Sequence, residues 1–322
     1  MREACLKTVF ALAQRDERVV FIGSDLGVGV LNEFKAAYPE RFFMEGVYEQ
    51  NLVGMAAGMA MEGRIVYLNT IATFLTRRCY EQIAVDLCMH NVNVRLIANG
   101  GGCVYAPLGP THLAIEDLSI MRALPNMAVL APADEPEMIR LMQATLNHNG
   151  PMYIRVAKGT EPKITTATAP FVIGQAVPFR EGRDALIACT GVGLHAALES
   201  ANQLNELGIR AAVLHFPTVK PLDEQMLFSF AEKVPVLVTV EEGTLMGGFG
   251  SAVLESLADA DLLIGRRVRR IGIPDVFPQT YGDQAGMLKS FGICAENITE
   301  TVRDLIAERA ARRAQRTHAD VA

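Results

Sequence analysis

The stretch Gly46-Val-Tyr-Glu-Gln-Asn-Leu-Val-Gly-Met-Ala-Ala-Gly-Met-Ala-Met61 places a single acid, Glu49, ahead of a run of small and apolar residues. This pattern predicts a helix that begins near Glu49 and continues to about Glu62, and an acid in the first turn complements the positive end of the helix dipole. Gly54 and Gly58 lie inside this helix, where each glycine costs about 1 kcal/mol relative to alanine. We therefore expect a large group or another backbone to approach the helix closely there.

The alternative for Glu49 is an ordinary acid at the start of an Ala/Gly-rich core helix. The stretch taken alone favours that alternative, although a buried carboxylate without a partner is unfavourable. Two later segments change the balance. They are Asn69-Thr-Ile-Ala-Thr-Phe-Leu-Thr-Arg-Arg-Cys-Tyr-Glu-Gln-Ile83 and Gly109-Pro-Thr-His112, the second of which is followed by Ile115-Glu116-Asp117.

Together the three segments resemble the pyrimidine-binding domain of the transketolase family of thiamine diphosphate enzymes. In that family a glutamate opens a Gly/Ala-rich helix, a Thr-Phe-x-x-Phe segment follows, and Gly-Pro-Thr-His comes next. The order and spacing match across most of residues 1–160, with Arg77 in place of the second phenylalanine. Arg77 after Thr73-Phe-Leu is closer to the pattern of the deoxyxylulose-phosphate synthases.

The resemblance implies a cofactor role for three residues. Glu49 would hydrogen-bond the ring nitrogen of the aminopyrimidine and favour its imino tautomer, whose nitrogen removes the proton from the thiazolium carbon. Phe74 corresponds to the aromatic residue that stacks on the same ring, and Ile71 would extend this apolar wall. Without the resemblance, an aromatic residue at a helix start is more often part of the core.

Asp25 follows the apolar run Arg18-Val-Val-Phe-Ile22 and Gly23. It therefore lies at the carboxyl end of an expected strand, where open α/β sheets bind ligands. By resemblance Asp25 aligns with an aspartate that faces the cofactor. A loop aspartate that caps the next turn explains it equally well.

Three residues are candidates for contact with the substrate. By resemblance His112 would do acid/base or hydrogen-bond work on a substrate oxygen, and Arg155 and Arg2 align with arginines that hold a sugar phosphate. A planar guanidinium suits a phosphate. The alternatives are a histidine satisfied at a helix start for His112 and surface ion pairs for the two arginines.

Apolar runs that alternate with helical patterns predict an α/β fold built from two doubly wound, mostly parallel sheets. We expect a pyrimidine-binding domain over residues 1–160, a linker over 161–184, a smaller domain over 185–310 and a frayed or disordered tail over 311–322. The expected strands lie at 18–22, 65–68, 92–97, 127–131 and 152–156, and then at 185–190, 210–215, 234–240 and 269–273.

The second half of the chain resembles the transketolase C-terminal domain. Three segments carry this resemblance, and they are closest to deoxyxylulose-phosphate synthases and to β subunits of 2-oxo acid dehydrogenases. The segments are Val219-Lys-Pro-Leu-Asp223, Val240-Glu-Glu-Gly-Thr-Leu-Met-Gly-Gly-Phe-Gly250 and Gly272-Ile-Pro-Asp275.

The composition excludes several classes of protein. The 322 residues, of which 50% are hydrophobic, can bury a large core. No apolar run reaches the roughly 18 residues of a membrane span, and the first residues do not form a signal peptide, so we expect a soluble, cytoplasmic protein. A net charge of −6 gives no basic footprint for nucleic acid, and the six scattered cysteines suggest neither zinc nor disulfides.

Two further positions depart from the transketolase pattern. Transketolases carry an acid immediately before Gly-Pro-Thr-His that contacts a hydroxyl of the ketose donor, whereas Leu108 stands at that place. A phosphate-contacting histidine of the family aligns with Gly100. These departures leave the donor open and would suit a smaller, deoxygenated or differently configured one.

The family's Mg²⁺ motif, Gly-Asp-Gly with a later Asn, does not occur in the sequence, and Gly282-Asp-Gln284 does not fit it. Because the family's cofactor lies between two domains, the resemblance implies a split enzyme. This chain would be its C-terminal (β) subunit, without metal ligands of its own. An N-terminal partner would hold Mg²⁺ and the diphosphate of a shared thiamine diphosphate, most simply in an α₂β₂ assembly with a homodimeric β core.

The function that we expect is transfer of a two-carbon ketol unit between sugar or sugar-phosphate substrates. The alternative within enzymes is decarboxylation of pyruvate or another 2-oxo acid, as in deoxyxylulose-phosphate synthases and 2-oxo acid dehydrogenases. A third alternative is a subunit that only binds or regulates. The presence of both Glu49 and Phe74 speaks against it, because a scaffold needs neither.

Overall fold

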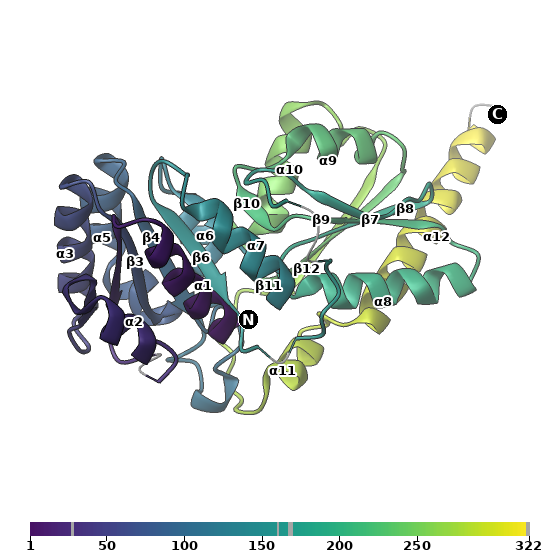
Figure 1. Ribbon diagram of the computed structural model, residues 1–322. Helices are drawn as coiled ribbons and strands as arrows, with labels where there is room; N and C mark the ends of the chain where they lie inside the picture. Colours follow the sequence, from purple (N-terminus) through teal and green to yellow (C-terminus); the bar gives the residue numbers. More distant parts are fainter. Residues whose placement is uncertain (27–28, 160, 167–169, 320–322) are drawn as a thin grey trace.

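Two β-sheets organise the chain in the computed structural model, which describes residues 1–26, 29–159, 161–166 and 170–319. Figure 1 shows the two sheets side by side, the first near the N-terminus and the second near the long C-terminal helix. The first sheet has seven strands, of which six are parallel, and the second has five, of which four are parallel. The predicted α/β class with two parallel-dominated sheets is confirmed.

The hydrogen bonds between strands define the order of each sheet. In spatial order the first sheet consists of β10 (Thr218–Lys220), β5 (Ala128–Leu130), β6 (Met152–Val156), β4 (Val94–Asn99), β3 (Ile65–Ile71), β1 (Val19–Gly23) and β2 (Phe42–Met44). The second consists of β12 (Arg267–Ile273), β11 (Val236–Thr244), β8 (Ala185–Cys189), β9 (Ala211–His215) and β7 (Val177–Arg180).

Helices cover the sheets and complete the core. In the first half they are α1 (Arg2–Arg15), α2 (Asn32–Ala37), α3 (Glu49–Met61), α4 (Ala72–Arg78), α5 (Tyr80–Gln82), α6 (Asp117–Arg122) and α7 (Glu135–Thr145), with the 3₁₀ turns η1 (Pro39–Arg41) and η3 (Ala106–Leu108) and the π-helix η2 (Ile83–Met89). In the second half they are α8 (Gly193–Glu206), α9 (Glu224–Ala231), α10 (Phe249–Asp259), α11 (Gln284–Ser290) and α12 (Ala295–Ala319).

Alternate residues of β1 show why its run is apolar throughout. Val20 and Ile22 pack in the cluster that includes α3, whereas Val19 and Phe21 pack in the cluster that includes α1 and α7. A strand covered by helices on both faces needs apolar residues at every position. This burial explains why the strands of the first sheet other than β2 and β10 could be predicted from short apolar runs.

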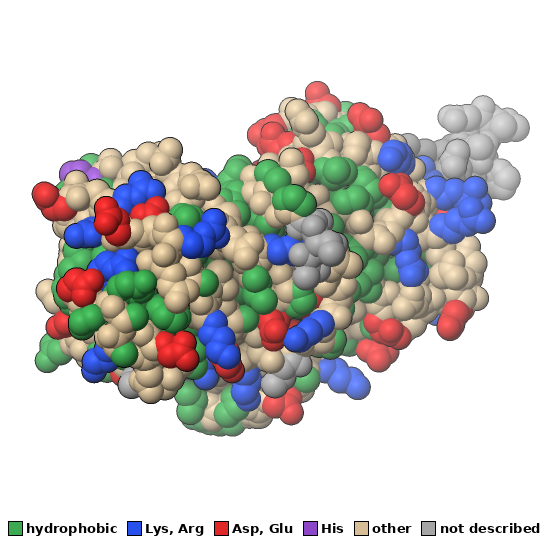
Figure 2. All heavy atoms as spheres, viewed as in Figure 1, with side chains coloured by type: hydrophobic (Ala, Val, Ile, Leu, Met, Phe, Trp, Pro, Cys, Tyr) green, Lys and Arg blue, Asp and Glu red, His purple; other side chains and the backbone are tan. Residues whose placement is uncertain are grey.

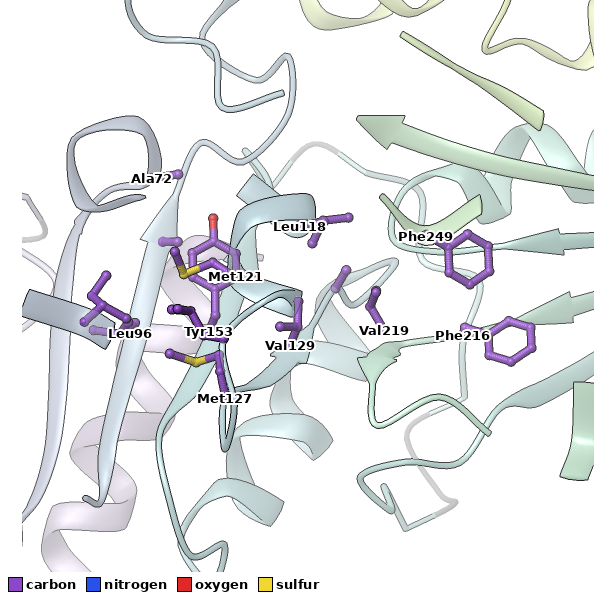
Figure 3. Close-up of a cluster of buried hydrophobic side chains, with 14 of the residues drawn as sticks. Ala72, Leu96, Leu118, Met121, Met127, Val129, Tyr153, Phe216, Val219 and Phe249 are labelled. Atoms are coloured by element: carbon purple, nitrogen blue, oxygen red, sulfur yellow. The ribbon is translucent and has the colours of Figure 1, made fainter. Parts of the chain in front are cut away.

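One core cluster continues from the first sheet into the second. Leu96, Tyr153 and Val129 of the first sheet belong to the same buried cluster as Phe216 and Phe249 of the second half. Figure 3 shows Val219, on β10, between the two groups. The two sheets are therefore joined by packed apolar side chains as well as by the chain itself.

The structure differs from the sequence expectation at the domain junction. Strand β7 lies within the predicted linker 161–184 and pairs with β9, while β10 comes from the second half and pairs with β5 of the first sheet. Neither has an apolar run, because β7 is an edge strand and β10 has three residues. Residues 167–169 of the predicted linker lie outside the described residues.

The predicted tail 311–322 also differs from the expectation. Helix α12 continues the backbone as a helix to Ala319, and residues 320–322 lie outside the described part of the chain.

None of the helices among the described residues has the length and apolarity to cross a bilayer. Figure 2 shows charged side chains of both signs interspersed with apolar ones on the face in view.

Glu241, in the fully buried part of β11, caps helix α10. Its carboxylate accepts hydrogen bonds from the backbone N–H groups of Phe249 at 2.7 Å and Gly250 at 2.8 Å. Burial raises the pKa of this carboxyl from 4.5 to about 7, although the two N–H groups and nearby arginines oppose the rise. A raised pKa means that protonation of Glu241 favours the folded state.

We expect the stability contributed by Glu241 to be fully present below pH 4.5 and lost as pH rises through about 7. The rise in pKa corresponds to roughly 3 kcal/mol of unfolding free energy. Urea unfolding at acidic and alkaline pH measures it, and the loss of stability should shrink by about this amount in Glu241→Gln. The same substitution at exposed Glu232 serves as the control, and an equal pH dependence in native protein and Glu241→Gln would contradict the assignment.

Candidate functional site

A polar network lies where three neighbouring parallel strands, β1, β3 and β4, end. The hydroxyl oxygens of Ser24 and Thr70 lie 3.0 Å apart, and Nδ2 of Asn99 donates to Oδ1 of Asn69 and to the carbonyl oxygen of Thr70. Oδ1 of Asn99 is buried and has no partner among the described residues. This edge therefore carries unused hydrogen-bonding capacity where doubly wound sheets bind ligands.

Glu49 is the first residue of α3, as the sequence predicted. Its side chain is only 2% exposed, and Oε2 accepts a hydrogen bond from Nη1 of Arg78 at 3.1 Å. Arg78 is 42% exposed and ends helix α4. The buried carboxylate is thus neutralised by an arginine that reaches it from the surface.

The ring of Phe74, on α4, lies between Arg78 and His112. The guanidinium carbon of Arg78 is 4.2 Å from the centroid of the Phe74 ring, and the His112 ring centroid is 5.2 Å away at an angle of 62°. Oγ1 of Thr111 lies 3.0 Å from Nδ1 of His112. The structure therefore brings Glu49, Phe74 and His112 into one cluster, linked by Arg78.

The other predicted cofactor residues lie at the same edge of the sheet. Ile71 ends β3 directly before α4 and is partly buried. Asp25 is exposed just beyond β1 and accepts a hydrogen bond from Oγ of Ser24 at 2.8 Å. Arg2 is exposed at the start of α1, whose first residues adjoin Gly159, just after β6. No contact of Asp25 or Arg2 with Glu49 is recorded among the described residues.

Arg155, on β6, is buried in an ion pair. Its Nε and Nη2 donate to the two carboxylate oxygens of Asp117 at 2.9 Å, and Nη2 also donates to the carbonyl oxygen of Ala114. Asp117 is fully buried and also accepts from the hydroxyl of Tyr153. Burial opposes the charge on Arg155, but Asp117, Glu242 and Tyr153 together outweigh it and hold the pKa of Arg155 above its ordinary value.

This ion pair does not support the prediction that Arg155 holds a substrate phosphate. Two edges of its guanidinium already face Asp117 and Ala114, and the side chain is 7% exposed. The contact to Ala114 lies two residues beyond His112. Arg155 instead contacts the segment that carries His112, through the carbonyl oxygen of Ala114.

Residues 1–162 match the family model of the transketolase pyrimidine-binding domain, and residues 174–298 match that of the transketolase C-terminal domain. The chain belongs to the transketolase family. The C-terminal match includes β7, in agreement with the placement of that strand in the second sheet.

Relatives of two kinds resemble the chain. The 1-deoxy-D-xylulose-5-phosphate synthase of Syntrophotalea carbinolica is 38% identical over 302 residues, which are 93% of this chain and 47% of that protein. The 1-deoxy-D-xylulose-5-phosphate synthase 1 of Geobacter sulfurreducens is also 38% identical, over 94% of this chain and 48% of that protein. The chain spans about half the length of these curated relatives. A solved structure described as a split gene transketolase, inactive beta4 tetramer, is 33% identical to this chain, with a TM-score of 0.86. The match covers 95% of this chain and 97% of that one.

Arg77 has a positioning role in this transketolase-family site that the sequence did not reveal. Its guanidinium forms an ion pair with Glu116, and Nη2 donates to the carbonyl oxygen of Leu113 at 2.9 Å. Arg77 and Arg155 thus hold the segment after His112 from two sides. A signal was available in the sequence, because an arginine in place of an apolar family residue needs a polar partner.

Of the departures at Gly100 and Leu108, the first is filled by a tyrosine, and a second tyrosine lies against Gly109, next to Leu108. Gly100 has φ +79°, and a Cβ there would lie 2.0 Å from Cε2 of Tyr105, so the Tyr105 ring takes the room of a side chain. Beyond half-exposed Leu108, Gly109 has φ +78°, and a Cβ there would lie 2.6 Å from Cε1 of Tyr281. Tyr281 comes from the second half of the chain, so sequence reasoning gave it no place at the site.

The loop that carries Tyr281 is pinned to the first domain. The carboxylate of Glu242 accepts from the backbone N–H of Cys103 at 2.9 Å and from Nε2 of Gln284 at 2.8 Å. Gln284 opens α11, which lies at the bottom of Figure 1. The second half therefore borders the candidate site. Among the described residues, no group of three or more His, Cys, Asp or Glu could hold a metal ion.

Proposed function

We propose that this chain is the C-terminal subunit of a thiamine diphosphate-dependent split transketolase, which transfers a two-carbon ketol unit between sugar or sugar-phosphate substrates together with an N-terminal partner. The observation that carries the proposal is the cluster of Glu49, Phe74 and His112. The end-to-end likeness to a split gene transketolase supports the division into subunits. We also propose a cytoplasmic location and a division into two domains, in which β7 belongs to the second.

The residues of the cluster fit an aminopyrimidine. Glu49 offers a buried carboxylate, and the planar guanidinium of Arg78 now lies against both this carboxylate and the Phe74 ring. A flat group with N–H donors at its edge is therefore accommodated between the two residues. Glu49 and Phe74, with Ile71 beside them, would hold the ring, and Asp25 lies at the same strand edge.

Bound thiamine diphosphate supplies an electron sink for a carbanion next to a carbonyl group. Glu49 would hold the pyrimidine nitrogen through its buried carboxylate, which could share a proton with that nitrogen. The contact between Thr111 and Nδ1 of His112 orients that ring, so that Nε2 exchanges a proton with a substrate oxygen. Arg2 is the proposed contact for a substrate phosphate, and Arg155 contributes by fixing the segment beside His112.

The diphosphate and Mg²⁺ would be held by the N-terminal partner in an α₂β₂ assembly with a homodimeric β core. The surface of α3 supports a close neighbour there, because Gly54 and Gly58 are exposed and nothing lies within 4 Å of a Cβ built on either. The solved relative that is described as an inactive tetramer of β chains supports the need for a partner.

The alternative is decarboxylation of pyruvate or another 2-oxo acid by the assembled pair. The 38% identity to 1-deoxy-D-xylulose-5-phosphate synthases favours it. So do Leu108, Gly100 and Arg77, since an apolar residue and a filled space replace two polar contacts of the transketolase pattern.

The assembled pair separates these functions. The chain is co-purified with an N-terminal partner that carries Gly-Asp-Gly and a downstream Asn, and is assayed with a ketose phosphate plus an aldose, and with pyruvate plus a triose phosphate. Ketol transfer without CO₂ release supports the transketolase function, whereas CO₂ release that requires pyruvate supports the alternative. A pair inactive with both sets of substrates would contradict the proposal and favour a binding or regulatory subunit.

A further inference from the structure

Arg78 touches both residues that the proposed function assigns to the aminopyrimidine. Nη1 lies 3.1 Å from Oε2 of Glu49, and the guanidinium carbon lies 4.2 Å from the centroid of the Phe74 ring. A single planar group therefore makes a hydrogen bond to the carboxylate and a cation–π contact with the ring. These are the two contacts that the aminopyrimidine needs from this chain.

Arg78 can move more easily than the two residues that it contacts, Glu49 and Phe74. Glu49 is 2% exposed at the start of α3 and Phe74 lies within α4, whereas the Arg78 side chain is 42% exposed at the last residue of α4. A long side chain at a helix end, with an open surface beside it, can leave without disturbing the backbone. A cation that stacks on an aromatic ring at such a site is held only weakly.

We propose that Arg78 occupies the place of the aminopyrimidine in the chain without its partner and has to leave when the cofactor binds. This inference rests on the proposed function. The guanidinium keeps the buried Glu49 carboxylate paired until the ring arrives, because a buried carboxylate without a partner is unfavourable. Arg78 thus competes with the cofactor for Glu49 and Phe74.

Arg77 provides a matched control on the same helix. It is the neighbouring arginine, but its guanidinium faces Glu116 and the carbonyl oxygen of Leu113 instead of Glu49. Removing Arg77 takes away the same charge without opening the place on Phe74. A lysine at position 78 separates charge from shape, since an ammonium can pair with Glu49 but does not cover the ring as a planar guanidinium does.

The test uses the full chain alone and two probes, thiamine and 4-amino-2-methylpyrimidine, whose binding is measured by isothermal titration calorimetry and by the shift in melting temperature. A competitor that fills most of the sites lowers the apparent affinity by the fraction of open sites. We expect Arg78→Ala to bind both probes about tenfold more tightly than the native chain. Arg78→Lys should show a smaller gain, and Arg77→Ala none.

The double variant Arg78→Ala with Glu49→Gln should lose the gain, because the carboxylate is the other half of the proposed contact. Equal or weaker binding by Arg78→Ala than by the native chain, or no binding of either probe by Arg78→Ala, would overturn the inference. Activity of the assembled pair with Glu49→Gln tests the proposed function separately. If the Glu49→Gln pair is inactive but the Arg78→Ala chain binds the probes no more tightly than the native chain, the proposed function stands and only the Arg78 inference is overturned.

Discussion

Replacing Glu49 by glutamine is expected to lower the kcat of the assembled pair by about 10²–10⁴-fold, the range typical of a lost acid/base group. Glutamine keeps the size of the side chain and can still accept from Arg78, but it carries no charge to share a proton with the pyrimidine nitrogen. Because the position is 2% exposed at the start of α3, the change affects the chemistry of one buried group. Steady-state kinetics of the native and variant pairs measure the loss.

The control is the same substitution at Glu62, which is exposed at the other end of the same helix. Glu62→Gln should leave kcat unchanged. Circular dichroism and melting of both variants separate lost activity from lost folding, and glutamine at position 49 should leave the spectrum as it is. A Glu49→Gln pair with native turnover would remove Glu49 from the catalytic site and with it the thiamine argument.

Local signals placed Glu49 and Phe74 correctly in the fold. The helix that begins at Glu49 combines a glycine break with a first-turn acid and a run of small residues, and the structure starts α3 at that residue. The strands of the first sheet that were predicted are buried on both faces, so each shows an uninterrupted apolar run. Features that depend on nearby residues could therefore be predicted from the sequence.

Features that depend on residues far apart in the sequence could not be predicted. Tyr281 reaches Gly109 from the second half of the chain, and Glu242 accepts from Cys103 across 139 positions. No periodicity in a single sequence reports such pairs. The contact of Phe74 with Arg78 is different, since residues four apart share one helix face. That spacing was visible in the sequence and could have directed attention to Arg78 as well as to Arg77.

Arg155 aligns with a phosphate-binding arginine of the family, but this alignment does not decide what its side chain contacts. Position 155 lies near the carboxyl end of a strand as expected, yet its guanidinium is turned into the protein against Asp117. The acid lies 38 residues earlier, in a segment that the sequence linked only to Gly-Pro-Thr-His. The sequence analysis therefore included Asp117 but could not predict that it pairs with Arg155.

Asp117→Ala is expected to reduce the free energy of unfolding by about 3–5 kcal/mol, the usual effect of removing one partner from a buried ion pair. The substitution leaves the Arg155 guanidinium charged in a buried place, and it removes the acceptor of the Tyr153 hydroxyl. Urea unfolding of the full chain, followed by circular dichroism, measures the change. A loss below about 1 kcal/mol, the effect of a surface ion pair, would contradict the role of the pair in holding this region together.

A second variant distinguishes a structural arginine from one that binds phosphate. Asp117→Leu combined with Arg155→Met removes both charges, and an apolar pair of similar size should restore most of the stability lost in Asp117→Ala. If Arg155 only fixes the segment beside His112, the assembled double variant should change KM by the same factor for a phosphorylated and an unphosphorylated substrate. A KM that rises tenfold or more (about 1.4 kcal/mol) for the phosphorylated substrate, but not for an unphosphorylated one, would return the phosphate-binding role to Arg155.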